Sequence, residues 1–288
     1  MAFVQDPCVP VFDRKRKNMS EKFRSTIRSF FTKPPLKGRI NGKNCGLEDA
    51  KMNGWFQQET GDLITGFRIG AEDTVLDVGC GDGGACIFAA NQGAEVIAVD
   101  ILDEAIQRVD RRLANSKARA HRAIVSDANP LPLEDNTATC VMAMEVLEHV
   151  DDPAQFLSEL VRVGKPQARY LITVPDPVAE NVQKRLATPS YWSKPNHLRI
   201  FGREELDQAV SEAGLMIESR GYKSFFWAMW WILFWGVEQK VGEPEEPVLA
   251  NWTATWNELL KSPKGNSVRN ALDEFMPKSQ YVIARKAA

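Results

Sequence analysis

A glycine-rich turn flanked by carboxylates is the part of this sequence best suited to bind a ligand. Residues 75–78 form an apolar run of the kind a buried strand needs, Gly79, Gly81 and Gly83 follow, and helix-compatible residues come next. In a strand, glycine-rich turn and helix, backbone amides can approach a nucleotide closely. A second apolar run ends in Asp100, at about the spacing that places an acid on a ribose.

The same turn also fits a dinucleotide-binding pattern, because residues 79–84 satisfy G-x-G-x-x-G. An NAD-dependent oxidoreductase is therefore one alternative. Asp77 at the strand end and Asp82 inside the turn argue against it, since carboxylates repel a pyrophosphate. A ligand that carries an ammonium and a sulfonium group but no phosphate suits these acids better, and S-adenosyl-L-methionine (SAM) is such a ligand.

Here the sequence resembles the class I SAM-dependent methyltransferases, whose first motif is matched by Asp77, Gly79, Gly81 and Gly83. The resemblance covers residues 55–222, and the EVLEHV segment is similar to that of ubiquinone-biosynthesis O-methyltransferases. It implies a SAM-dependent enzyme that releases S-adenosyl-L-homocysteine. We expect a small or amphipathic, lipid-like acceptor that is methylated at a hydroxyl oxygen. A nitrogen or carbon acceptor stays open, as does a non-catalytic SAM-binding protein.

The resemblance also implies which residues hold the cofactor. The glycines bring backbone to it, Asp77 lies near its methionine amino group, and Asp100 accepts both ribose hydroxyls. The full expected set is Asp77, Gly79, Cys80, Gly81, Gly83, Asp100, Ile101, Asp127, Ala128 and Met144. Ile101 packs on the adenine face in this interpretation, and Asp127 with Ala128 lies at the adenine amino group.

The acceptor side is expected after the fourth strand. Glu145, Glu148 and His149 form a Glu-x-x-Glu-His run, which the resemblance links to substrate or divalent-metal binding. Glu145 and His149 share a face if the segment begins a helix. We expect no resident metal there and a structural hydrogen bond for His149. If the acceptor is a neutral hydroxyl it needs a base, and His149, His197 and Glu145 are the catalytic candidates.

The pattern of apolar runs predicts an α/β fold, a doubly wound, mostly parallel seven-stranded sheet of the Rossmann-like type. The expected strands are 74–79, 95–100, 120–125, 138–144, 168–174, 215–221 and 279–285, and the expected helices are 84–92, 103–115, 152–163 and 203–213. The resemblance implies that the last strand runs antiparallel.

Four regions are expected around this core. Residues 1–54 form a basic amphipathic helix within 12–33 and then a loop or lid, residues 55–222 form the SAM-binding core, and 278–288 supply its last strand. The stretch 55–67 is predicted to be helical, and 175–199 to be an insertion that covers the site. Residues 223–277 form an aromatic-rich cap between the last two strands.

Aromatic residues of these additions are candidates to contact the acceptor, namely Trp55, Tyr191, Trp192, Trp227 and Trp231. The segment 225–235 has three open interpretations: a helix buried in the cap, a wall for a greasy acceptor, or a segment that dips into a membrane interface. It is too short for the roughly 20 residues that span a bilayer. The basic N-terminal helix could pack on the core or lie on an anionic membrane.

Composition limits the remaining possibilities. The chain has 288 residues with a net charge of −2, so nothing attracts it to nucleic acid as a whole. The Asn/Asp-Pro-Pro-aromatic tetrapeptide of amino-methylating DNA enzymes is absent, and we expect no nucleic-acid partner. Five cysteines without a CxxC pair indicate reduced thiols and, with no export signal, a cytoplasmic protein with possible membrane association. The sequence leaves the oligomeric state open.

Overall fold

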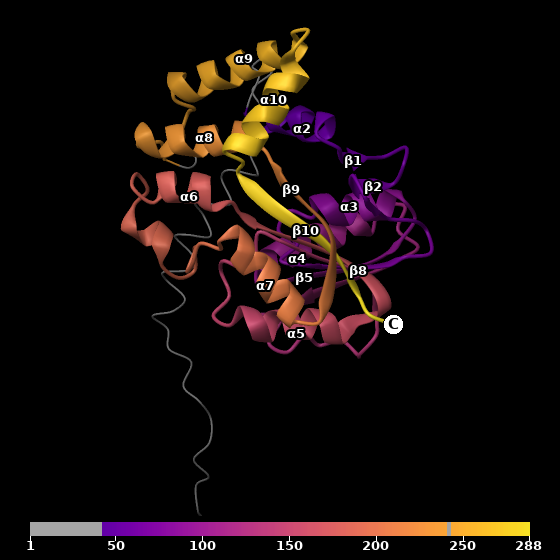
Figure 1. The fold of residues 1–288 in the computed structure, drawn as a ribbon. Helices are drawn as coiled ribbons and strands as arrows, with labels where there is room; N and C mark the ends of the chain where they lie inside the picture. The colour runs from indigo at the N-terminus through magenta and orange to yellow at the C-terminus, as the bar shows by residue number, and fades with distance from the viewer. Residues whose placement is uncertain (1–41, 241–242) are drawn as a thin grey trace, which may run out of the picture.

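The computed structural model describes residues 42–240 and 243–288, which form a seven-stranded core sheet covered by helices (Figure 1). The order of the strands is β6-β5-β4-β7-β8-β10-β9. The strands are β4 (Thr74–Val78), β5 (Glu95–Asp100), β6 (Ala120–Val125), β7 (Ala138–Met144), β8 (Gly164–Pro175), β9 (Leu215–Lys223) and β10 (Ser279–Lys286). β10 runs antiparallel to both β8 and β9, and the other pairs are parallel. The predicted fold class is confirmed.

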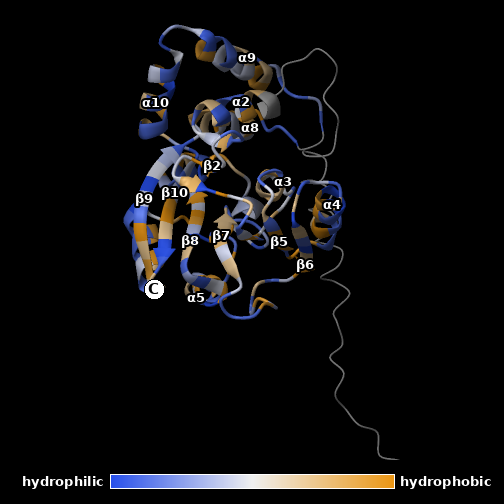
Figure 2. Ribbon diagram, turned by 90° about the vertical axis from the view of Figure 1, so that its right-hand side faces the viewer, coloured by the Kyte–Doolittle hydropathy of each residue, from blue (hydrophilic) through white to orange (hydrophobic). Residues whose placement is uncertain are grey.

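Helices cover both faces of this sheet because the strand residues alternate between two apolar cores. Val75 packs in one core with α3 (Gly84–Asn91) and α4 (Asp103–Leu113). Leu76 and Val78 pack in the other, with α5 (Pro153–Val163) and α7 (Arg203–Glu212). Figure 2 shows apolar residues in the middle of β8 and β10, inside these layers. The four helices predicted from the sequence are confirmed.

Two predictions for the N-terminal part are wrong. Residues 42–52 of the expected loop form helix α2 (Gly42–Met52). The expected helix at 55–67 is instead a small antiparallel sheet of β1 (Trp55–Gln57), β2 (Asp62–Ile64) and β3 (Phe67–Arg68). Gly61 has φ +79° in the turn between β1 and β2, a conformation that a helix does not contain. The basic helix expected within 12–33 lies outside the described residues.

The cap over the carboxyl edge of the parallel strands is helical and has its own core. It consists of α8 (Phe225–Gly236), α9 (Pro247–Lys261) and α10 (Gly265–Phe275), packed with α2 (Figure 1). The buried members of its core are Cys45, Phe225, Phe226, Trp230, Phe234, Leu249 and Trp256. Most of the aromatic segment 225–235 is therefore a helix packed inside the cap, the first of its three interpretations.

The insertion after β8 lies beside the cap. It contains α6 (Pro177–Gln183), whose N-cap Asp176 accepts a hydrogen bond from the amide of Val178, and a 3-10 helix η1 (Pro189–Trp192). Trp235 of the cap donates its indole N–H to Gln183 at 3.4 Å, which joins the two additions. Among the described residues, no helix combines the length and the apolar composition that crossing a membrane requires.

Candidate active site

The glycine-rich turn after β4 leaves open space where a side chain would otherwise stand. Gly81 has φ +51°, and a Cβ built on it would meet no atom within 4 Å. Gly79 packs on the other side, where an added Cβ would overlap the side chain of Val146. The turn therefore has one open surface and one surface in contact with the segment after β7.

Asp100 at the end of β5 fixes this turn. Its Oδ2 accepts the amide N–H of Gly81 at 2.9 Å, and its Oδ1 accepts the amide N–H of Leu102 at 2.9 Å. The carboxylate oxygens keep lone pairs beyond these two bonds. Next to it, the side chain of Ile101 is 65% exposed and stands free beside the turn.

The other predicted cofactor residues have different surroundings. Asp77 is buried, and its Oδ2 accepts the thiol of Cys86 at 3.1 Å. Burial raises the pKa of the Asp77 carboxyl to about 6, and the nearby charge of Asp100 adds to this rise. Asp127 is exposed and accepts the amide of Asn129, while Ala128 is buried with φ +59°.

Glu145 follows β7 in a strained backbone conformation, with φ +58°. Its carboxylate accepts the hydroxyl of Thr173 at 2.9 Å and forms an ion pair with Lys278. Burial lowers the pKa of the Lys278 ammonium to about 8. Sequence analysis missed Lys278, which lies between α10 and β10 outside any motif.

The segment after Glu145 forms turns and not the start of a helix, so Glu145 and His149 do not share a helical face. Glu148 and His149 instead come together with His197 of the insertion. One ligand atom from each of these three residues lies within 4.8 Å of the others. Glu145 is paired with Lys278, so the Glu-x-x-Glu-His run is divided: Glu145 lies beside β10, and Glu148 and His149 lie beside the insertion.

Burial governs the protonation of this cluster. Glu148 is 1% exposed, and burial raises its carboxyl pKa to about 8. The pKa of His149 falls to about 4, mainly because partial burial of the ring disfavours its charged form and also because His197 lies beside it. The two imidazole rings meet edge to face, with their centroids 4.8 Å apart.

His197 is held from both ends of its ring. Its Nδ1 lies 2.9 Å from Oε2 of Glu180 on α6, and its Nε2 lies 3.3 Å from the hydroxyl of Tyr191. Glu180 is 2% exposed and was missed from the sequence, because one acid inside a short helix carries no motif. A buried carboxylate that accepts an imidazole N–H fixes the tautomer of the ring.

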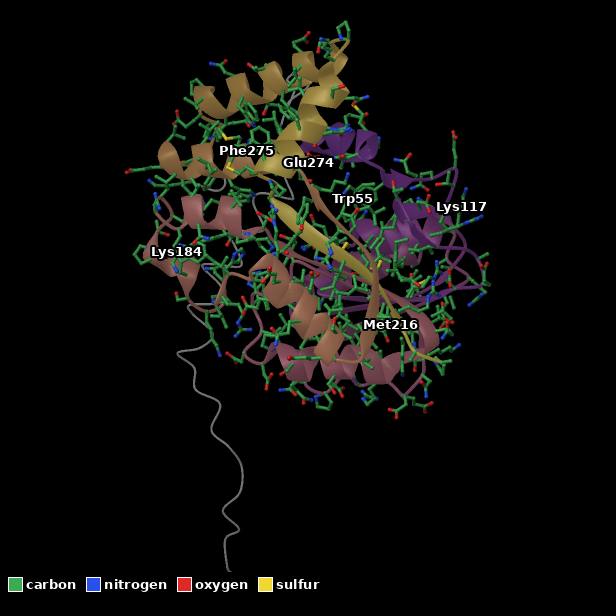
Figure 3. All side chains as sticks on the ribbon, viewed as in Figure 1. Trp55, Lys117, Lys184, Met216, Glu274 and Phe275 are labelled. Carbon is green, nitrogen blue, oxygen red and sulfur yellow. The ribbon has the colours of Figure 1, made fainter. Side chains whose placement is uncertain are left out.

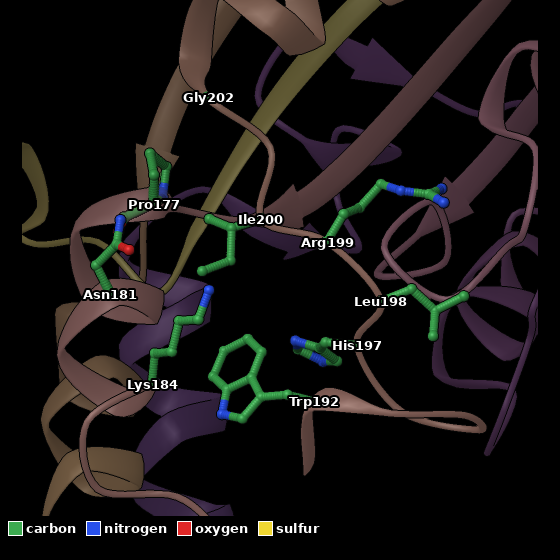
Figure 4. A pocket seen from close by; sticks show the side chains of 9 residues that line it. All are labelled: Pro177, Asn181, Lys184, Trp192, His197, Leu198, Arg199, Ile200 and Gly202. Atoms are coloured by element: carbon green, nitrogen blue, oxygen red, sulfur yellow. The ribbon is translucent and has the colours of Figure 1, made fainter. Parts of the chain in front are cut away.

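A cavity of about 460 Å³ opens beside His197 (Figure 4). Its wall includes Asn181, Lys184 and Trp192 from the insertion and Ile200 directly after it. In Figure 4 the side chains of Lys184 and Ile200 converge on this space, and that of Arg199 points away from it. The cavity combines apolar surface with polar groups, as small-molecule sites do.

The five aromatic candidates for acceptor contact are dispersed. Tyr191 and Trp192 pack around His197, with ring centroids 4.7 Å and 6.0 Å from it. Trp227 packs over Gly46 inside the cap, and Trp231 stacks on Trp235. Trp55 packs against Tyr281 of β10, in the region labelled in Figure 3. The structure thus brings Tyr191 and Trp192, but not the other three, to the histidine cluster.

Comparison with known proteins adds the family to this geometry. Residues 12–220 match the model of a methyltransferase domain. The chain belongs to this methyltransferase family. Its fold and family are those of the class I SAM-dependent methyltransferases, so SAM is its cofactor, and the oxidoreductase alternative is set aside. Gly81, Asp100 and Ile101 fit that cofactor, because open space, a carboxylate and an exposed apolar side chain lie next to one another.

Two curated relatives illustrate the match. The methyltransferase is 41% identical over 101 residues to a chloroplastic tocopherol O-methyltransferase of Arabidopsis thaliana. This alignment covers 34% of this chain and 29% of the relative. The methyltransferase is 31% identical over 172 residues to a "Probable S-adenosylmethionine-dependent methyltransferase" of Mycolicibacterium smegmatis, covering 59% and 62%. It therefore spans less than two thirds of the length of these relatives.

A solved structure shows the same fold. The geranyl diphosphate C-methyltransferase of Streptomyces coelicolor A3(2) aligns with a TM-score of 0.54 and 17% identity, over 91% of this chain and 87% of that one. At this identity the likeness concerns the fold alone.

Proposed function

We propose that this protein transfers a methyl group from SAM to a hydroxyl oxygen of a small, amphipathic molecule. The observation that carries the proposal is the open surface over Gly81, which Asp100 borders. On its other side the turn contacts Val146, which belongs to the segment that contains Glu145 and His149. A cofactor bound over Gly81 would direct its methyl group toward the carboxyl ends of β7 and β8. SAM supplies an electrophilic methyl carbon when it is bound.

In this proposal the remaining cofactor residues keep the roles expected from the sequence. Asp100 binds the ribose hydroxyls, Ile101 covers adenine, and Asp77 lies below the methionine end, with Met144 nearby. Asp127 and Ala128 border the adenine amino group. Because the reaction is a displacement, alignment of the reactants and exclusion of water supply most of the acceleration.

The chain's own polar groups would orient the acceptor. A neutral imidazole at His149 can accept a hydrogen bond from an acceptor hydroxyl, and the low pKa of this ring keeps it neutral. His197 can do the same, since Glu180 holds the proton on its other nitrogen. Glu145, fixed by Thr173 and Lys278, supplies a third polar contact. Tyr191 and Trp192 favour an acceptor with an apolar body.

The cofactor part is tested by titrating the purified protein with S-adenosyl-L-homocysteine in a calorimeter. Asp100→Ala is expected to weaken binding at least about tenfold, since it removes the ribose contact and the anchor of the turn. Asp110→Ala, an exposed acid on α4, is the matched control and should bind normally. Equal affinity in both variants would contradict the proposed cofactor site.

The acceptor part is tested with methyl-labelled SAM and small-molecule extracts. Label is expected in an organic-soluble product whose mass rises by one methylene, and its fragmentation identifies the modified atom. Transfer to nitrogen or carbon would overturn the oxygen assignment alone. Cofactor binding without transfer to any molecule would favour a non-catalytic SAM-binding protein.

A further inference from the structure

Glu148 is a buried carboxyl group whose side chain makes no hydrogen bond to the described residues. It is 1% exposed, and neither of its oxygens makes a hydrogen bond. Its nearest basic neighbour is Nε2 of His149, 3.7 Å from Oε1, which is beyond hydrogen-bonding distance. Buried polar groups are nearly always paired, so an orphaned carboxylate at this position calls for a partner.

The two neighbouring imidazoles are oriented as metal ligands usually are. Nδ1 of His149 lies 3.3 Å from the backbone oxygen of Pro195, and Nδ1 of His197 lies 2.9 Å from Glu180. If each Nδ1 donates its proton to that oxygen, both Nε2 atoms carry a lone pair. In protein metal sites the second ring nitrogen is held in this way by a carboxylate or a carbonyl.

We propose that Glu148, His149 and His197 bind one divalent transition-metal ion, with Zn²⁺ as the best match. Two imidazole nitrogens and one carboxylate oxygen are the ligand set of zinc sites that keep a fourth position open. Glu180 and the Pro195 carbonyl act as positioning groups, because they orient the two rings. Glu145 is not a ligand, since it is paired with Lys278.

The cluster needs only a small adjustment to close on an ion. Its three ligand atoms lie within 4.8 Å of one another, and tetrahedral zinc at about 2.1 Å from each ligand holds them about 3.4 Å apart. The long 3.3 Å contact between Tyr191 and Nε2 of His197 is the one hydrogen bond that the ion would replace. Side-chain rotations in the loop segments 147–150 and 193–199 can supply this movement.

The ion would be reachable by an acceptor. The side chain of His149 is 35% exposed, and His197 lines the 460 Å³ cavity. With the ion bound, an acceptor hydroxyl would take the open position in place of hydrogen bonds to the two imidazoles. It would lose its proton to solvent more readily there, because a divalent ion lowers the pKa of a bound oxygen. The C–O bond then forms as the methyl–sulfur bond breaks. This use of the ion rests on the proposed function, whereas metal binding itself does not.

The experiment uses the full chain after dialysis against a chelator. Zn²⁺ is titrated by calorimetry, and Co²⁺ by its visible absorption, which reports the coordination geometry. One ion per chain is expected, with a tetrahedral or five-coordinate cobalt spectrum. Glu148→Gln, His149→Gln and His197→Gln should each weaken zinc binding at least tenfold. Glu180→Gln should weaken it by about 10- to 100-fold through the loss of ring orientation.

His121→Gln is the matched control, because this third histidine lies on β6 beside Asp110. It should keep wild-type zinc affinity, as should Glu145→Gln. Circular dichroism checks folding. If Glu148→Gln does not fold, zinc binding is compared in His149→Gln, whose side chain is partly exposed. No stoichiometric zinc in the wild type, or loss only in His121→Gln, would overturn the proposal. Binding of S-adenosyl-L-homocysteine in the same metal-free samples tests the cofactor site separately.

Discussion

The proposed cofactor side and the proposed acceptor side of the sheet edge are constructed differently. The turn at Gly79–Gly83 is made of backbone, anchored by one carboxylate from the adjacent strand. The acceptor side is made of side chains from distant segments, including Glu145, His197 and Lys278. A backbone site depends on local φ values and on empty space. A side-chain site depends on how the insertion and the cap pack over the core.

The largest expected difference between the two sides is the loss of S-adenosyl-L-homocysteine affinity in Gly81→Val. Valine would fill the open space over the turn and is strained at φ +51°. Binding of S-adenosyl-L-homocysteine should weaken at least about 1000-fold, or about 4 kcal/mol. Gly214→Val is the matched control, because Gly214 has φ +87° and equally open surroundings at the α7–β9 turn. Calorimetry that finds the two variants equally competent would contradict the cofactor assignment.

The next effect is on the cap. Trp256 is 1% exposed and donates its indole N–H to Asp49 at 3.0 Å. Trp256→Ala should lower the free energy of unfolding by about 3–5 kcal/mol, and Trp256→Phe by about 1–3 kcal/mol, because it mainly removes the hydrogen bond. Denaturant titration measures both losses. Affinity for S-adenosyl-L-homocysteine should stay unchanged, and a parallel loss of affinity would show that cap and cofactor side are coupled.

The smallest effect concerns pH. Burial raises the pKa of Asp49 to about 6, above its unfolded value. The folded state therefore binds this proton more tightly, and the stability it contributes is lost as the pH rises from about 4 through 6. Asp49→Asn keeps the acceptor for Trp256 and removes the charge. The variant should match the wild type at pH 4 and exceed it at pH 7.5 by on the order of 1 kcal/mol.

Urea titrations at the two pH values measure this difference. A less stable variant at pH 7.5 would mean that attraction to Arg269 and Lys223 outweighs the cost of burying the charge. Cofactor binding should follow the same pH profile in both proteins, since Asp49 lies in the cap and away from the glycine turn.

The cofactor side could be predicted because its signals are local. Alternating apolar runs predict the strands, and Thr74 to Asp100 is one continuous βαβ unit with recognisable spacing. The stretch 55–67 was misread, since its aromatic and apolar residues do not reveal the positive φ of Gly54, Gly61 and Gly66. The turn glycines, and not the side chains between them, determine that this segment forms a small sheet instead of a helix.

The acceptor side could be predicted only as a list of chemical types. Glu148, His149 and His197 were recognisable as residues able to do chemistry, but their contact depends on the path of the insertion after β8. Glu180 and Lys278 had no sequence signal, because each acts through one partner brought close by folding. Trp227 and Trp231 pack against the core of the cap, and the sequence alone does not reveal that packing.

The position of β10 has a consequence for how the molecule is assembled. This strand is inserted between β8 and β9, although it follows both of them and the whole cap in the chain. Until residues 279–286 are synthesised, β8 and β9 have no common neighbour and Lys278 cannot be fixed against Glu145. A nascent chain can therefore shape the half proposed to bind the nucleoside early, while the half proposed to receive the methyl group takes form only when this late strand closes the gap.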